Sequence, residues 1–132
     1  MILKLSIKNY RLIEKLDVNF KEGFSSITGE TGAGKSIILG ALNLISGARV
    51  DHQIVGPKNE KCIVEGEFLI SESLVDFFNF HDLDFDDHTI LRREILVNGK
   101  SRAFINDSPV KLDTIKSLSE KLINVHLSLI HI

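Results

Sequence analysis

Apolar and polar side chains alternate strictly in two early segments of the chain, residues 3–8 and residues 15–20. A period of two is typical of a strand that buries one of its faces, so both segments are predicted to be strands. Similar reasoning predicts a strand at Cys62–Ile70 and two more at Thr89–Val97 and Ser101–Ile105. The pattern therefore indicates a chain that devotes much of its length to a sheet.

Three further segments have helical periodicity. Residues 35–46 are apolar on nearly all sides, so this helix is expected to be buried on more than one face. Gly40 inside it costs roughly 1 kcal/mol relative to alanine, which indicates close packing there, and Gly47 is a plausible stop. A short helix is predicted at residues 72–80. Asp113 is predicted to cap a last helix, whose apolar positions are Ile115, Leu118, Leu122 and Val125.

The connections between these elements carry two turn signals and one acidic loop. Asn98-Gly99 separates the last two strands and favours a two-residue type I′ hairpin turn. Residues 106–109 are predicted to turn the chain before the last helix. Residues 81–88 hold several aspartates and two histidines, but they do not fit a calcium-binding loop, because Asp87 stands where glycine is needed. A solvated acidic loop is the favoured interpretation.

Composition narrows the class of protein only modestly. The 132 residues are 43% hydrophobic and 26% charged, with a formal net charge of −2, which is ordinary for one globular domain. Such a charge provides no global basic field to attract nucleic acid. A single cysteine, Cys62, excludes an internal disulfide and fits a reducing compartment. No stretch approaches the ~20 apolar residues of a membrane span, so a cytoplasmic location without a membrane partner is expected.

The most specific chemical signal is a complete G-x-x-x-x-G-K-[ST] phosphate loop, placed between a predicted strand at Phe24–Thr28 and the helix at 35–46. Backbone N–H groups at the start of a helix, freed by glycines from the bulk of Cβ atoms, can cradle the phosphates of a nucleotide. The lysine adds a mobile charge near the β- and γ-phosphates, and the serine hydroxyl can bind Mg²⁺. The predicted nucleotide-binding residues are Gly29, Glu30, Thr31, Gly32, Ala33, Gly34, Lys35 and Ser36, with Ser36 as the magnesium ligand.

The order of the elements points to one class of phosphate-loop protein. Two strands precede the loop strand, and a hairpin follows the first helix, whereas small-molecule kinases usually begin with the loop strand itself. The predicted fold is therefore α/β, a P-loop NTPase with a mixed sheet of antiparallel strands plus the loop strand. It resembles the N-terminal lobe of the ATPase heads of ABC and SMC proteins, with the rest of the head missing.

Several segments make the resemblance more specific. They are Ile7–Tyr10, the filling of the phosphate loop, Gly47–Asp51, Arg92–Ile95 and Gly99–Asn106. Over residues 1–126 the chain resembles the N-terminal head of the RecN family of bacterial DNA repair proteins. The resemblance implies an SMC-like ATPase of recombinational double-strand break repair, in the cytoplasm at the nucleoid. It also implies ATP and Mg²⁺ as cofactors, a second head that sandwiches ATP, and DNA as a partner.

The same resemblance implies parts that this sequence does not show. The Walker B carboxylates, the signature motif and the coiled coil belong to the remainder of such a protein, including the C-terminal half of the same head. The chain alone is therefore expected to bind nucleotide weakly and to hydrolyse it poorly or not at all. At Ser128 the family has a glutamine, and residues 127–132 match a translated sequencing-adapter sequence. They are predicted to be a non-native tail, with a genuine frameshifted or shortened protein as the alternative.

Five basic residues are candidates for DNA contact: Arg49, Arg92, Arg93, Lys100 and Arg102. The last four lie on one predicted hairpin. They are interpreted either as contacts with DNA phosphate or as a solvated face of the sheet, and the second interpretation is favoured. Arg49 follows a helix stop and either reaches phosphate or pairs with an acid. Tyr10 and Cys62 are both expected to be core residues. Two other functions stay open, a stand-alone P-loop phosphotransferase and a nucleotide-binding module without hydrolysis.

Overall fold

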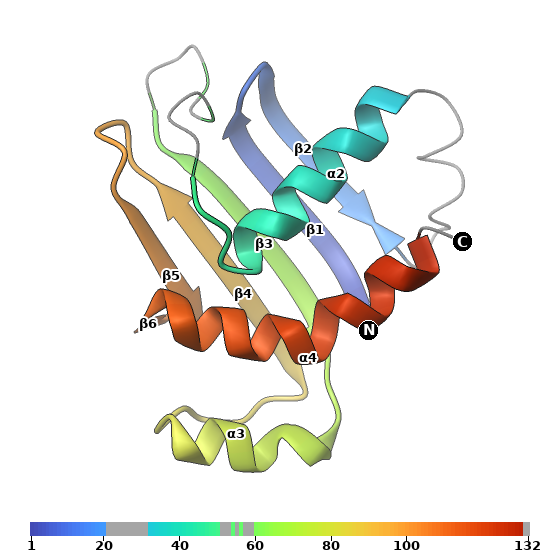
Figure 1. Cartoon of the computed structure of the whole chain (residues 1–132), viewed down its shortest axis with the longest axis vertical. Coiled ribbons are helices and arrows are strands. Elements are labelled where there is room, and N and C mark those ends of the chain that lie inside the picture. The colour runs from blue at the N-terminus through green and yellow to red at the C-terminus, as the bar shows by residue number, and fades with distance from the viewer. Residues whose placement is uncertain (21–31, 51–53, 55, 57–59, 131–132) are drawn as a thin grey trace.

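The computed structural model describes residues 1–20, 32–50, 54, 56 and 60–130, and it shows a six-stranded sheet with helices packed on it (Figure 1). The sheet order is β2-β1-β3-β4-β5-β6, and every neighbouring pair is antiparallel. The predicted strand at 24–28 lies outside the described residues. The strands are β1 Ile2–Tyr10, β2 Ile13–Asn19, β3 Cys62–Leu69, β4 His88–Ile95, β5 Ser101–Ile105 and β6 Ser108–Val110.

Helices α2 (Gly32–Ile45) and α4 (Leu112–Ile130) lie across the same face of the sheet (Figure 1). A 3₁₀ turn at Glu72–Leu74 and helix α3 (Val75–Phe80) form at the end of the sheet where β3 leads into β4. None of the described helices is long and apolar enough to cross a membrane. The 3₁₀ turn and α3 together confirm the helix predicted at 72–80, apart from its irregular first turn.

The strands alternate between a buried face under the helices and a polar face on the other side. In the register, Ile7 lies opposite Val64, and Val64 lies opposite Arg93. All three side chains are buried, so they belong to the face that α2 and α4 cover. This face supplies most of the core, together with apolar positions of the two helices, namely Ile38, Ala41, Leu42, Ile45, Ile115, Leu118 and Leu122. The period-two interpretation of the strands is confirmed.

Close packing between α2 and β1 occurs at Gly40, as its cost in helix propensity had indicated. A Cβ atom at Gly40 would collide with the hydroxyl of Tyr10 and would lie 3.4 Å from Cζ of that ring. Tyr10 is 6% exposed and stands at the end of β1. Tyr10 is therefore a core residue, as predicted from the sequence.

The turn at Asn98-Gly99 differs from the prediction, whereas the turn predicted within residues 106–109 is present at Asn106 and Asp107. Asn98 is not among the described residues with positive φ, and only Gly99, at φ 90°, adopts it in that turn. The N–H of Gly99 donates to Leu96 O at 2.9 Å, so the turn has three residues with glycine in the left-handed position. The type I′ prediction is therefore wrong here. The left-handed pair occurs instead at Asn106 and Asp107, with φ 49° and 66°, which join β5 to the unpredicted strand β6.

The last helix begins slightly earlier than predicted. Lys111 O accepts from the N–H groups of Thr114 and Ile115, at 3.0 and 3.3 Å, and α4 starts at Leu112. Asp113 therefore lies in the first turn of the helix and not at its cap. A carboxylate in that turn still complements the positive end of the helix dipole.

Candidate functional site

The phosphate-loop sequence continues directly into α2. Gly32, Ala33 and Gly34 already belong to the helix, whereas Gly29, Glu30 and Thr31 lie outside the described residues. The first four N–H groups of an α-helix have no partner within the helix and carry the positive end of its dipole. Lys35 is half-buried and Ser36 is exposed in this first turn. The start of α2 can therefore present N–H groups, an ammonium and a hydroxyl to an anion.

The opposite end of α2 is closed by a glycine stop. Gly47 adopts φ 92°, its N–H donates to Leu44 O at 3.2 Å, and the N–H of Ala48 donates to Asn43 O at 3.1 Å. This pair of bonds is the Schellman arrangement, so the predicted stop is confirmed. A Cβ atom at Gly47 would lie only 3.0 Å from Cβ of Lys116 on α4. The turn and α4 are thus packed as closely as a glycine permits.

Arg93, on β4, reaches from the sheet to this closed end of α2. Its Nη1 donates to Leu44 O and to Ala48 O, both at 2.9 Å, and its Nη2 donates to Ser101 Oγ at 3.2 Å. The side chain is 1% exposed, and desolvation lowers the pKa of Arg93 from its ordinary value. Arg93 therefore has no surface to offer to DNA in this structure, in contrast to its place among the predicted contacts.

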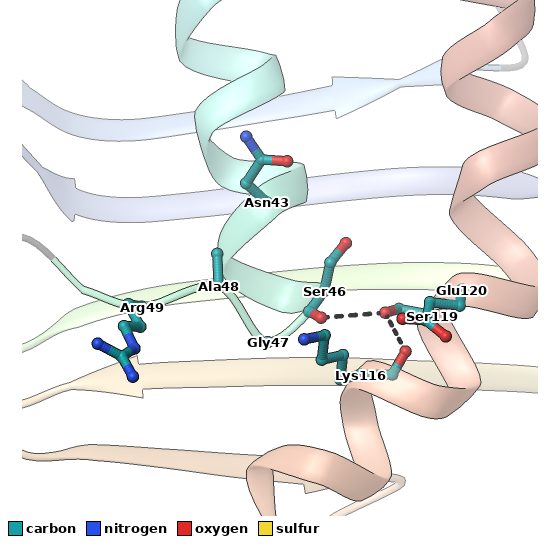
Figure 2. Close-up of a pocket in the computed structure, with 8 residues that line it drawn as sticks. All are labelled: Asn43, Ser46, Gly47, Ala48, Arg49, Lys116, Ser119 and Glu120. Carbon is teal, nitrogen blue, oxygen red and sulfur yellow. Dashed lines mark hydrogen bonds between the residues drawn. The ribbon is translucent and has the colours of Figure 1, made fainter.

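A second residue holds the same turn from the helical side. Ser119 on α4 donates from Oγ to Ser46 O at 3.2 Å, as Figure 2 shows. Around this contact lies an open pocket of about 360 Å³, and the exposed side chains of Arg49 and Lys116 stand at it. The lining residues are Asn43, Ser46, Gly47, Ala48, Arg49, Lys116, Ser119 and Glu120.

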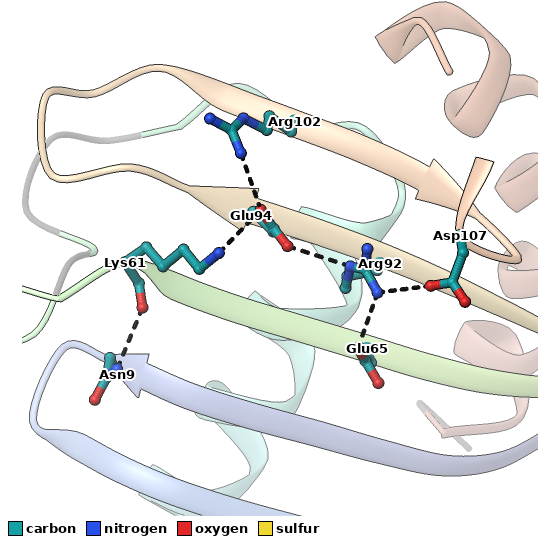
Figure 3. A network of polar contacts seen from close by, with 7 residues as sticks. All are labelled: Asn9, Lys61, Glu65, Arg92, Glu94, Arg102 and Asp107. Carbon is teal, nitrogen blue, oxygen red and sulfur yellow. Dashed lines mark hydrogen bonds and ion pairs between the residues drawn. The ribbon is translucent and has the colours of Figure 1, made fainter. Parts of the chain in front are cut away.

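The open face of the sheet carries a network of charges centred on Glu94 (Figure 3). The Glu94 side chain is only 9% exposed and lies within ion-pair distance of three cations: Arg92 at 3.3 Å, Lys61 at 3.5 Å and Arg102 at 3.8 Å. Arg92 also contacts Asp107 at 2.9 Å and stacks over the ring of Phe104 at 4.2 Å. These basic groups are therefore largely neutralised by neighbours.

The five candidate DNA contacts do not form one surface. Arg92 and Arg102 meet on the open face around Glu94, Lys100 is exposed in the β4–β5 turn, and Arg93 is buried under the helices. Arg49 follows the Gly47 turn after α2 and lines the same pocket as Lys116 and Ser119 of α4. The sequence signal that separates Arg93 from its neighbours is alternation, because Leu91, Arg93 and Ile95 share the buried face. Alternation therefore places Arg93 on the opposite face of β4 from Arg92.

The remaining candidates are structural. Cys62 is fully buried in the core, and desolvation raises the pKa of its thiol to about 11, so the residue is an apolar filler. In the described part of the chain, which includes the acidic loop at 81–88, no group of three or more His, Cys, Asp or Glu side chains could hold a metal ion. Ser36 stays the predicted magnesium ligand.

Comparison with known proteins gives a family. The profile of the AAA domain family matches residues 4–131, nearly the whole chain. The chain belongs to the AAA domain family. It is also homologous to the N-terminal SMC-like ATPase head of RecN, as the sequence resemblance implied.

Three curated relatives support the RecN homology. The chain is 40% identical over 128 residues to the DNA repair protein RecN of Vibrio cholerae. It is 36% identical over 129 residues to that of Bacillus subtilis and 34% identical over 131 residues to that of Haemophilus influenzae. Each match covers 96% of this chain but only 22–24% of the relative. The chain therefore spans about a quarter of the length of these proteins.

Solved structures support the fold. A chain from a structural study of ATP-driven dimerization and DNA-stimulated activation of SMC ATPases superposes with a TM-score of 0.67 at 22% identity, over 88% of this chain and 75% of that one. The SMC head domain of Thermotoga maritima gives 0.56 at 17% identity, over 88% and 41%. The recombination mediator RecF gives 0.62 at 22% identity, over 87% and 29%. The predicted fold, part of an SMC-type ATPase head, is confirmed.

Proposed function

We propose that this chain is the ATP-binding part of a RecN-type, SMC-like ATPase that acts in the recombinational repair of DNA double-strand breaks. The observation that carries the proposal is the continuity of the phosphate loop with α2, a helix packed on an antiparallel sheet of the SMC-head type. Residues Gly32–Ser36 of that sequence form the start of α2, where the positive end of the helix dipole supports an anion-binding role.

The glycines, the lysine and the serine of the loop have distinct roles in this proposal. The glycines Gly29, Gly32 and Gly34 let the main chain approach the triphosphate, and the amides of Gly32–Lys35 donate to its oxygens. The ammonium of Lys35 neutralises charge on the β- and γ-phosphates. The hydroxyl of Ser36 would contribute a ligand to Mg²⁺, which would neutralise part of the negative charge on the phosphates.

The proposal includes partners that complete the site. Phosphoryl transfer to water needs a group that orients the water and the metal, and we assign that group to the C-terminal half of the same head. A second head would close over the nucleotide in an ATP-sandwiched dimer. DNA would contact exposed cations of this chain, for which Arg49, Lys100 and Arg102 are better placed than Arg93. A cytoplasmic place at the nucleoid follows from this role.

Titration of the purified chain with a fluorescent ATP analogue and Mg²⁺ tests the proposal. We expect saturable binding that Lys35→Ala weakens about ten- to a hundredfold, because a charge-assisted contact with phosphate is lost. Lys121→Ala removes an exposed lysine from α4 and serves as the charge-matched control. Circular dichroism establishes that each variant is folded.

The same titration is repeated in a chimaera in which this chain replaces the matching segment of Vibrio cholerae RecN. A folded chimaera that gives no saturable signal, or equal binding by the Lys35→Ala and Lys121→Ala variants, would refute the ATP site. Multiple-turnover phosphoryl transfer to a small acceptor by the chain alone would instead identify a phosphotransferase. Tight binding without phosphate release, even in the chimaera, would identify a non-hydrolysing module.

A further inference from the structure

Arg93 is unusual among the described basic residues because it is buried and has no acidic partner in the part of the chain that the structure describes. Its three acceptors, Leu44 O, Ala48 O and Ser101 Oγ, are all uncharged oxygens. Burying a guanidinium is costly unless its N–H groups are satisfied, and its Nε is buried without a hydrogen-bond partner. The cost of burying this charge is offset by the carbonyl end of α2, where the helix dipole favours a cation. This buried charge therefore stays in place only while the end of α2 keeps its position.

The two carbonyls that Arg93 binds stand on either side of the Gly47 turn. Leu44 O belongs to the last turn of α2, and Ala48 O follows the glycine. One nitrogen, Nη1, bonds to both, so the distance between the carbonyls is fixed across the turn. Lysine could not reproduce the whole set, because it lacks the planar fork that also reaches Ser101 on β5.

The same turn is held from the opposite side by α4. Ser119 Oγ donates to Ser46 O, and Gly47 packs against Lys116 at the limit of close approach. Arg49 is the next residue after the clamped Ala48 carbonyl, and it is exposed at the pocket that Lys116 also lines (Figure 2). The placement of this exposed cation is therefore determined by groups on β4 and α4.

We propose that Arg93 is a positioning residue that fixes the Gly47 turn and thereby sets the direction of Arg49. The proposal rests on the proposed function only for what Arg49 does, namely contact with DNA phosphate. A purely structural role for Arg93 would instead lower the stability of the whole chain without a specific effect on this turn. The two roles make different predictions for local opening and for coupling between the two arginines.

Amide hydrogen exchange of the full chain tests the local effect without any ligand. In both Arg93→Met and Arg93→Lys, we expect the amides of Gly47 and Ala48 to exchange at least about tenfold faster, because charge-assisted bonds across the turn are lost. Amides of β1 and β2 should change little. Arg92→Met is the matched control, since it removes the neighbouring arginine on the open face of the sheet and should leave both turn amides unchanged.

A double-mutant cycle tests whether Arg93 acts through Arg49. The measured quantity is the affinity for a short DNA duplex at low salt, together with its salt dependence. Arg49→Ala should weaken binding and reduce the salt slope by about 1. Arg93→Lys should reproduce much of this loss even though the lysine keeps the positive charge. The Arg49→Ala/Arg93→Lys double variant should bind no more weakly than Arg49→Ala alone.

The outcomes separate the proposals. Unchanged exchange at Gly47 and Ala48, rescue by lysine, or faster exchange spread evenly over the sheet would overturn the positioning role. Additive losses in the cycle would also overturn it, because Arg93 would then act independently of Arg49. If Arg49→Ala leaves DNA binding unchanged, the DNA contact in the proposed function fails, while the exchange data still decide whether Arg93 fixes the turn.

Discussion

Substitution of Gly40 by alanine places the packing of α2 on β1 under a direct test. Alanine is the better helix former, so helix propensity alone predicts a gain of about 1 kcal/mol. The structure predicts the opposite sign, because the new Cβ would collide with the hydroxyl of Tyr10. Tyr10 is 6% exposed, so its ring has little room to move away.

The magnitude follows from the two opposing effects. Overpacking of a buried site costs about 1–3 kcal/mol, which outweighs the gain in propensity and leaves a net loss of about 0–2 kcal/mol. The next atom of the ring, Cζ, lies 3.4 Å from the new Cβ, which is an ordinary contact. Removal of the hydroxyl alone should therefore relieve the clash. In a Tyr10→Phe background, Gly40→Ala should stabilise the chain by about 0.5–1 kcal/mol.

Urea denaturation followed by circular dichroism measures all four members of this cycle. Asn43→Ala, at an exposed position of the same helix, is the control and should have a small effect that Tyr10→Phe does not alter. The reasoning is refuted if Gly40→Ala stabilises the native background. It is equally refuted if its effect is the same with and without the tyrosine hydroxyl, because the clash would then not determine the sign.

Three further predictions concern the buried side chains of Cys62 and Glu94. Since the pKa of Cys62 is raised from 9.0 to about 11 by burial, native chain should react with a thiol reagent only as fast as it unfolds; rapid labelling of folded protein would contradict this. Because the unfolded thiol ionises first, stability should also decline as pH rises from about 9 towards 11. Glu94→Gln should lower the free energy of unfolding by about 1–2 kcal/mol in urea denaturation, because three cations lose their shared carboxylate. The control is Asp17→Asn, which removes an exposed ion pair with Lys15 and should lower that free energy by less than about 0.5 kcal/mol. Equal losses would show that burial of Glu94 adds nothing.

Much of the fold could be predicted because the chain obeys simple periodicities. Alternation located β1, β2 and β3, and the apolar character of residues 35–46 together with Gly47 located α2 and its end. Strand β6 could not be predicted, since Ser108–Val110 is too short for a period and includes a proline. It forms only because β5 offers an edge for pairing.

Turn geometry and side-chain partners were harder to predict. Asn98-Gly99 has the composition of a type I′ turn, yet the pairing of Leu96 with Lys100 closes a loop of three residues. For the candidate site, the sequence located the phosphate loop but not the groups that close the other end of α2. Arg93 and Ser119 bind carbonyls that no sequence pattern identifies, because those contacts depend on how β4 and α4 meet the helix.

The position of β1 has a consequence for how the chain is made. This first strand lies inside the sheet, with β2 on one side and β3 on the other. Its partner β2 leaves the ribosome immediately afterwards, but β3 emerges only after the phosphate loop and α2. During synthesis the nascent hairpin therefore keeps one unsatisfied edge, and a two-stranded ribbon alone is barely stable. The sheet becomes cooperative only once β3 has arrived to pair with β1, and α2 has to wait until then for the surface against which it packs.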